Sequence, residues 1–106
     1  MGIKDIDPYT VKDWLVQDKA ILVDVREAHE HAREHIALAH HVPLSCFDPS
    51  RIPVAEGKSV VYYCASGART AQFGHHLTRA LGDFCDVYHL SGGIFAWKMA
   101  GFETEI

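Results

Sequence analysis

Three short apolar segments, each followed by a stretch with helical periodicity, limit the folds available to this chain. The apolar segments cover residues 20–25, 59–63 and 86–90, and their branched and aromatic residues are typical of buried strands. Strands that alternate with helices form a parallel sheet, because each helix carries the chain back to the start of the next strand. We therefore predict an α/β fold with a central, mostly parallel β-sheet flanked by helices on both faces.

Local signals indicate where several helices begin and end. Asp7 and Pro8 are typical of a helix start, and apolar residues at helical spacing continue this helix to about Gln17. Residues 27–35 are polar and strong in helix formers, so they predict a solvated helix. Residues 94–100 predict an amphipathic helix that follows the third strand.

The middle of the chain contains an irregular segment and a longer helix. Residues 45–58 include two prolines and Gly57, a composition typical of a surface connection. Residues 69–81 predict one continuous helix that ends at Gly82. One face of this helix carries Phe73, Leu77, Ala80 and Leu81.

Size and charge exclude several classes of protein. With 106 residues, the chain has room for one core, so we predict a single domain over residues 1–106. A formal net charge of −4, with no basic stripe, argues against nucleic-acid binding. The longest apolar run, residues 60–65, is far below the roughly 18 residues of a membrane span, so we expect no membrane insertion. The first residues lack the apolar stretch of a signal peptide, and a cytoplasmic location is the expectation.

The cysteines provide the first candidate for chemistry. Three cysteines, an odd number, argue against a disulfide framework and leave at least one free thiol. Cys46 lies in the irregular connection and Cys85 precedes a strand, and neither has a local signature, so we expect neither to be essential. Of the two, Cys46 is expected to be the more exposed.

Cys64 differs because it ends an apolar strand and begins a loop of small residues that leads into a helix. In open α/β sheets, ligands bind beyond the carboxyl ends of strands, where unpaired N–H groups face anions. A thiol with a pKa of about 8.5 is only ~3% ionised at pH 7, so a reactive cysteine needs such groups to stabilise its thiolate. The candidate loop consists of Ala65, Ser66, Gly67, Ala68, Arg69 and Thr70. From this loop alone, a reactive thiol and a buried, inert cysteine remain open alternatives.

Four segments in this order resemble the rhodanese-like sulfurtransferase family over nearly the whole chain. They are LVDVRE at residues 22–27, HI at 35–36 with Ala39 and VPL at 42–44, VVYYC at 60–64 with Ser66, Gly67 and Arg69, and LSGGIFAW at 90–97. The resemblance implies a small α/β domain, in agreement with the alternation of strands and helices.

The resemblance also implies a reaction. In it, Cys64 attacks the outer sulfur of a donor such as thiosulfate, keeps that sulfur as a persulfide and releases sulfite. Cyanide or a thiol then accepts the sulfur, and the acceptor could also be a protein. The main-chain amides from Ala65 to Arg69 would hold the terminal sulfur, with no cofactor and no metal.

The chain departs from the family pattern at two places. Many members carry a basic residue directly after the cysteine, where this chain has Ala65 and Ser66, so thiosulfate is expected to be a poor donor. Glu34 and Leu38 stand where the family often has glycine, so the turn between them is expected to differ in shape.

The same residues are also compatible with other functions. Related phosphatases and arsenate reductases have one more residue between cysteine and arginine, whereas four residues separate Cys64 from Arg69 here. A non-catalytic or regulatory binding module is a further alternative, since a fold does not determine a function. The combination of Cys64, Gly67 and Arg69 favours the enzyme.

Other polar and aromatic residues have competing interpretations. His31 to His35 spells the His-x-x-Glu-His pattern of one zinc protease class, but the chain has little room for a protease cleft, so we predict no metal. Asp24 and Arg26 end the first predicted strand and could support the pocket as a charge pair, although a structural contact is the favoured interpretation. Trp97 and Phe95 are predicted to lie in the core. The remaining histidines are predicted to lie on the surface.

Overall fold

A five-stranded parallel sheet forms the centre of the computed structural model, which describes residues 3–106. The first two residues of the N-terminal segment discussed above lie outside the described part. The strand order is β1-β5-β4-β2-β3, and every neighbouring pair is parallel. The strands are β1 (Lys4–Ile6), β2 (Ala20–Asp24), β3 (His40–His41), β4 (Ser59–Tyr63) and β5 (Val87–Leu90). The predicted fold class and the three predicted strands are confirmed.

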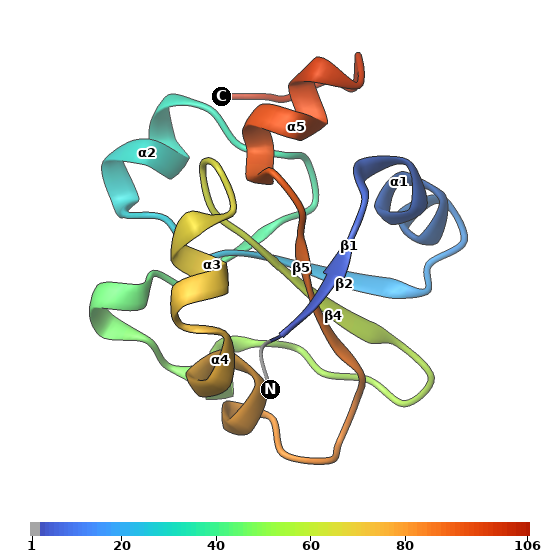
Figure 1. The fold of residues 1–106 in the computed structure, drawn as a ribbon, viewed down its shortest axis with the longest axis vertical. Coiled ribbons are helices and arrows are strands. Elements are labelled where there is room, and N and C mark those ends of the chain that lie inside the picture. The colour runs from blue at the N-terminus through green and yellow to red at the C-terminus, as the bar shows by residue number, and fades with distance from the viewer. Residues whose placement is uncertain (1–2) are drawn as a thin grey trace.

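The helices cover both faces of this sheet (Figure 1). They are α1 (Pro8–Val16), α2 (Ala28–Arg33), α3 (Ala68–Gln72), α4 (Gly74–Ala80) and α5 (Gly93–Met99), with short 3₁₀ turns at Leu44–Cys46 and Pro49–Arg51. The side chain of Asp7 accepts a hydrogen bond from Thr10 N at 2.9 Å and caps α1, as its residue type predicted. None of the helices in residues 3–106 is long and apolar enough to cross a membrane.

Side chains that alternate along the strands build two separate cores, because successive residues of a strand point to opposite faces. Leu22 and Tyr63 pack on the face covered by α1 and α5. Val23 and Tyr62 pack on the opposite face, with Leu77 of α4. Cys64, directly after β4, belongs to this second core and has no exposed surface.

Two predictions, the continuous helix over residues 69–81 and the burial of Phe95, are wrong. The single helix expected over residues 69–81 is broken into α3 and α4 at Phe73, whose side chain is 41% exposed. At the break, a Cβ on Gly74 would lie 2.9 Å from Cγ2 of Ile3, so the N-terminal segment occupies space that a larger residue would need. Phe95 is also exposed, because α5 turns Ile94 and Trp97 toward the core and leaves Phe95 on its outer side.

The sequence analysis did not predict the two edge strands, β1 and β3. β1 and β3 have three and two residues, and most of these are not buried. Such short, polar segments carry no apolar alternation from which a strand could be predicted. Their positions follow from pairing with the buried strands β5 and β2.

The turn after α2 keeps a left-handed backbone at one of the positions where glycine was expected. Leu38 has φ +71°, while Glu34 is extended at φ −168°. A non-glycine residue in the left-handed region is strained by roughly 1–2 kcal/mol. Since the Leu38 side chain is 76% exposed, packing does little to offset this strain.

Replacing Leu38 with glycine should therefore stabilise the protein. We expect Leu38→Gly to raise the free energy of unfolding by about 0.5–1 kcal/mol, because the relief of strain exceeds the entropy that glycine adds to the unfolded chain. Urea unfolding measures the change. The neighbouring Ala37→Gly substitution is the matched control and should lower stability. A Leu38→Gly protein that is less stable than the parent would contradict the strain at this residue.

Candidate active site

The predicted cysteine loop lies at the carboxyl end of the central strand. β4 pairs with β2 on one side and β5 on the other, and Cys64 follows its last residue directly. The chain then turns through residues 65–67 and enters α3 at Ala68. Because the sheet is parallel, the carboxyl ends of β2 and β5 meet at the same edge, which is where ligands bind in such sheets.

Within the loop, the sulfur of Cys64 has two polar neighbours. The backbone N–H of Gly67 donates to Sγ at an N–S distance of 3.1 Å. The Oγ1 atom of Thr70 lies 3.7 Å from Sγ. Gly67 itself has φ +91°, a conformation that glycine adopts without strain. The loop thus supplies one direct main-chain donor and one hydroxyl to the sulfur.

The start of α5 holds this loop in place. Ile94 N donates to the carbonyl of Cys64 at 2.9 Å, and Phe95 N donates to that of Ala65 at 3.1 Å. The two segments approach so closely that a Cβ on Gly93 would lie 2.4 Å from the Cys64 carbonyl oxygen. A Cβ on Gly67 would in turn lie 3.0 Å from Gly92 N. Gly92 and Gly93, which belong to the segment LSGGIFAW, help to form the site, a role that the sequence analysis did not assign to them.

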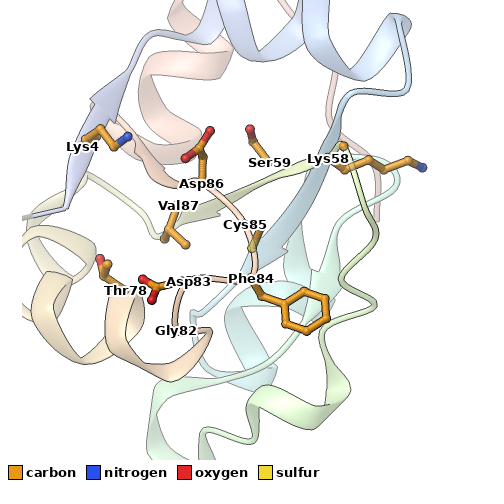
Figure 2. Close-up of a pocket in the computed structure, with 11 residues that line it drawn as sticks. Lys4, Lys58, Ser59, Thr78, Gly82, Asp83, Phe84, Cys85, Asp86 and Val87 are labelled. Carbon is orange, nitrogen blue, oxygen red and sulfur yellow. The ribbon is translucent and has the colours of Figure 1, made fainter.

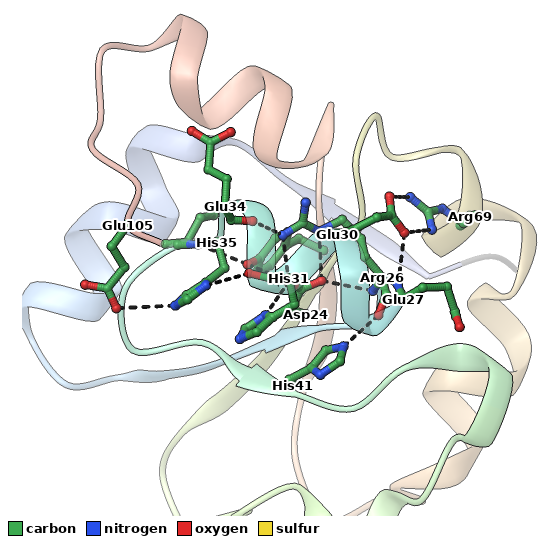
Figure 3. Close-up of polar contacts among 12 residues, drawn as sticks. Asp24, Arg26, Glu27, Glu30, His31, Glu34, His35, His41, Arg69 and Glu105 are labelled. Carbon is green, nitrogen blue, oxygen red and sulfur yellow. Dashed lines mark hydrogen bonds and ion pairs between the residues drawn. The ribbon is translucent and has the colours of Figure 1, made fainter.

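The side chain of Arg69 is held by α2 (Figure 3). Its two terminal nitrogens donate to the carboxylate of Glu30 at 2.8 and 2.9 Å. These hydrogen bonds, more than any other interaction, lower the pKa of Glu30 to about 2. The Arg69 guanidinium therefore fastens the loop to α2, and Glu30 is a partner that the sequence analysis missed. Glu30 and Arg69 lie 39 positions apart along the chain, so no local sequence pattern connects them.

Asp24 and Arg26 form a buried pair beside this network (Figure 3). Arg26 Nε and Nη2 donate to the Asp24 carboxylate at 3.0 and 2.8 Å, and the Tyr63 hydroxyl donates to it at 3.1 Å. Burial alone would raise the pKa of Asp24, but the hydrogen bonds from Arg26 and His31 outweigh it and hold the pKa below its usual range. Arg26 also donates to the carbonyl of Glu34 at 2.6 Å. These contacts tie the end of β2 to β4 and α2, as expected of a structural pair.

Comparison with known proteins agrees with this architecture. Residues 7–100 match the rhodanese-like domain. The chain belongs to the rhodanese-like family. It is 31% identical over 98 residues to thiosulfate sulfurtransferase GlpE of Coxiella burnetii, covering 92% of this chain and 90% of that protein.

Two further proteins that are similar to this rhodanese-like domain are longer than it. An uncharacterized protein of Synechocystis sp. is 44% identical over 99 residues, which is 93% of this chain and 54% of that protein. The chain therefore spans about half the length of this relative. The crystal structure of a thiosulfate sulfurtransferase from Pseudomonas aeruginosa superposes with a TM-score of 0.81 at 30% identity, covering 99% of this chain and 19% of that one.

The histidines of the His-x-x-Glu-His pattern have other partners in this rhodanese-like domain. His31 Nδ1 is 2.8 Å from Asp24 Oδ2, and His35 Nδ1 is 2.8 Å from the His31 carbonyl oxygen. The two rings stack with their centroids 4.0 Å apart. Stacked rings do not aim their nitrogens at a common point, and residues 3–106 contain no group of three or more ligand residues that could hold a metal. The surface prediction is wrong for His89, which is buried.

A cavity of about 550 Å³ lies at the amino ends of β4 and β5, whereas Cys64 follows the carboxyl end of β4. Figure 2 shows the residues that line this cavity. Its lining includes the first residues of β4 and β5, Ser59 and Val87, together with Cys85. Burial raises the pKa of the Cys85 thiol, which disfavours its reactive form. Cys46 is exposed, as predicted, and all three cysteines of the chain are free of disulfides.

The contact between Gly93 and the Cys64 loop predicts a severe effect of a single methyl group. We expect Gly93→Ala to lower the free energy of unfolding by about 3 kcal/mol, because overpacking adds to the strain of a positive φ. Gly57→Ala is the matched control, since Gly57 has φ +81° and open space around its Cα. The control should lose only about 1 kcal/mol. Equal losses in urea unfolding would show that the close approach at Gly93 does not restrain the loop.

The Arg69–Glu30 pair predicts a pH dependence of stability. Because the pKa of Glu30 falls from 4.5 to about 2 on folding, its contribution is complete above pH 4.5 and is lost as the pH falls toward 2. Glu30→Gln should reduce stability by about 1 kcal/mol at pH 7 and flatten the loss over that acid range. Unfolding at a series of pH values measures both effects. Glu56→Gln, on the exposed connection, is the control, and an effect of equal size there would contradict a specific role for Glu30.

Proposed function

We propose that this chain is a sulfurtransferase that carries a sulfane sulfur on Cys64. The observation that carries the proposal is the Gly67 N–H directed at Sγ, 3.1 Å away, at the carboxyl end of the central strand. Membership of the rhodanese-like family supports it, as does the similarity to proteins named thiosulfate sulfurtransferase.

The reaction consists of two displacements at sulfur. The Cys64 thiolate attacks the outer sulfur of thiosulfate, a new S–S bond forms, and the old one breaks with its electron pair on the departing sulfite. The product is a Cys64 persulfide with a negatively charged terminal sulfur. Cyanide or a thiolate then attacks that sulfur and releases the Cys64 thiolate. Both steps need a stabilised sulfur anion, for which loop N–H donors of the oxyanion-hole kind are suited.

The charges around the loop favour donors less anionic than thiosulfate. Ala65 and Ser66 carry no charge, and the Arg69 guanidinium is engaged by Glu30. A doubly charged donor would therefore meet little uncompensated positive charge. A small persulfide or the persulfide of a protein thiol is the donor class that this loop suits, with thiols as the matching acceptors.

A second candidate function is that of a binding module without catalysis. Cys64 has no exposed surface, and this burial favours the alternative. Catalysis requires the loop to move far enough for a donor to reach Sγ, and Ser66 and Ala68 are its exposed members. Phosphoryl transfer is less well supported, because only four residues separate Cys64 from Arg69 and the arginine is paired with Glu30.

Mass spectrometry of the intact protein tests the proposal. After incubation with cysteine persulfide or thiosulfate, the chain should gain the mass of one sulfur, and a reductant should remove it. The gain should persist in Cys46→Ser and Cys85→Ser proteins and disappear in Cys64→Ser. Thiocyanate release with cyanide should be faster with cysteine persulfide, which is less anionic than thiosulfate.

The same samples distinguish the alternatives. Failure of the parent protein to gain sulfur from either donor would favour the binding module. Hydrolysis of an aryl phosphate in the absence of sulfur transfer would favour a phosphatase. A Cys64→Ser protein that still gains the sulfur would refute the assignment of the site.

A further inference from the structure

A line of polar side chains leads from the protein surface to the sulfur of Cys64. Asp5 on β1 and His89 on β5 are cross-strand partners, and the Asp5 carboxylate contacts Nε2 of His89. On the other side of the ring, Nδ1 lies 2.6 Å from Oγ1 of Thr70. Thr70 has no exposed surface, and its Oγ1 lies 3.7 Å from Cys64 Sγ. An exposed carboxylate is thus connected to the buried sulfur through an imidazole and a hydroxyl.

The hydrogen of the Thr70 hydroxyl has three possible acceptors. The carbonyl oxygen of Gly67 lies 3.2 Å from Oγ1, in addition to the His89 nitrogen and the Cys64 sulfur. A hydroxyl donates only one hydrogen, so only one of the three can receive it at a time. Whether His89 Nδ1 carries a hydrogen decides whether this nitrogen can accept the Thr70 hydrogen.

The two protonation states of the ring have opposite effects. A neutral ring that donates Nε2–H to Asp5 has a lone pair on Nδ1, and this nearest acceptor takes the Thr70 hydrogen. A ring with hydrogen on both nitrogens donates Nδ1–H to Oγ1 and leaves the Thr70 hydrogen available. A sulfur anion is then a stronger acceptor than the neutral carbonyl of Gly67.

We propose that His89 is a positioning residue for sulfur transfer: when both its nitrogens carry hydrogen, it turns the Thr70 hydroxyl toward the anionic sulfur of Cys64. The inference rests on the proposed function, and it assigns to His89 on β5 the control of a second donor to the sulfur, the Thr70 hydroxyl. The hydroxyl stabilises the thiolate that attacks the donor and the same thiolate when it leaves the persulfide. His89 acts through Thr70 and makes no contact with the sulfur itself.

The charged surroundings of His89 leave Asp5 as its direct ionic partner among the contacts described. The Tyr62 hydroxyl, on the neighbouring strand β4, donates to the carbonyl of Leu77. The remaining ionisable groups on β1, β4, α3 and α4 are Lys4, Tyr63, Cys64 directly after β4, Arg69, which is held by Glu30, and the exposed His75, His76 and Arg79. Asp5 is exposed, so a substitution there alters the charge beside the ring with little effect on packing.

The first test measures alkylation of Cys64 as a function of pH, with peptide mapping to separate it from Cys46 and Cys85. Thr70→Val removes the hydroxyl and should slow alkylation about ten-fold, the effect expected of one hydrogen bond to a charged group. His89→Leu removes the competing acceptor and leaves the Thr70 hydrogen to the sulfur, so at pH 7 it should be alkylated at least as fast as the parent, and the double variant should behave as Thr70→Val. A His89→Leu protein that is alkylated more slowly than the parent, or a His89→Leu effect that persists in the Thr70→Val background, would overturn the proposal, because it would show that His89 does not act through Thr70.

Further variants separate this role from a general loss of structure. His89→Asn retains an amide that can donate to Thr70 but cannot gain a proton, so its pH profile should lack one inflection of the parent profile, as that of His89→Leu does. Asp5→Asn removes the carboxylate beside the ring and should change the parent profile, and it provides the test if His89→Leu does not fold. His76→Leu is the matched control and should behave as the parent. A parent profile that Asp5→Asn and His89→Asn both leave unchanged would overturn the proposal.

Turnover provides the second readout. Thr70→Val should lower kcat for thiocyanate formation about ten-fold and change KM for the donor less than two-fold, because the hydroxyl acts on the cysteine sulfur and not on the bound donor. His89→Leu should keep kcat at the parent value or above it. Alkylation requires no sulfur transfer. A protein that forms no persulfide but shows these effects on alkylation would refute the proposed function and retain the role of His89 in controlling the thiolate.

Discussion

The main-chain contact between the Cys64 loop and the start of α5 is the interaction on which the site depends. Ile94 and Phe95 donate to the first two carbonyls of the loop, and Gly93 permits the approach because any Cβ there would overlap the Cys64 carbonyl. With its carbonyls held from one side, the loop can direct the Gly67 N–H at the sulfur from the other. The geometry around the thiol therefore depends on two segments, the Cys64 loop after β4 and the start of α5 after β5.

The two arginines near the loop are paired with carboxylates, so they stabilise the structure and leave little positive charge to attract an anionic ligand. Arg69 is paired with Glu30, and Arg26 is paired with Asp24 at the end of β2. Both pairs connect α2 and its surroundings to the elements that carry the site. If the chain transfers sulfur as proposed, donor selection depends on shape and on main-chain dipoles, which suits small or singly charged sulfur compounds better than dianions.

The polar line through Asp5, His89 and Thr70 gives the edge strand β1 a role beyond completing the sheet. β1 has only three residues, but its register with β5 places Asp5 opposite His89. The sulfur consequently has a main-chain donor whose position depends on Gly67 and a side-chain donor whose direction depends on a titratable ring. A site of this kind combines a fixed anion-stabilising group with one that responds to pH.

The sequence by itself determined the α/β class, the three buried strands, the glycine helix stops and the position of Cys64 at a strand end, because these depend on local periodicity and on neighbouring residues. It did not determine β1, β3, the break at Phe73 or the exposure of Phe95, since these depend on which surfaces meet. The same holds within the site. The loop from Ala65 to Thr70 was evident as a string of small residues, but Glu30, Gly93 and His89 joined it only through folding. Contacts between residues tens of positions apart are made by the sheet order and the helix packing, and no local pattern encodes them.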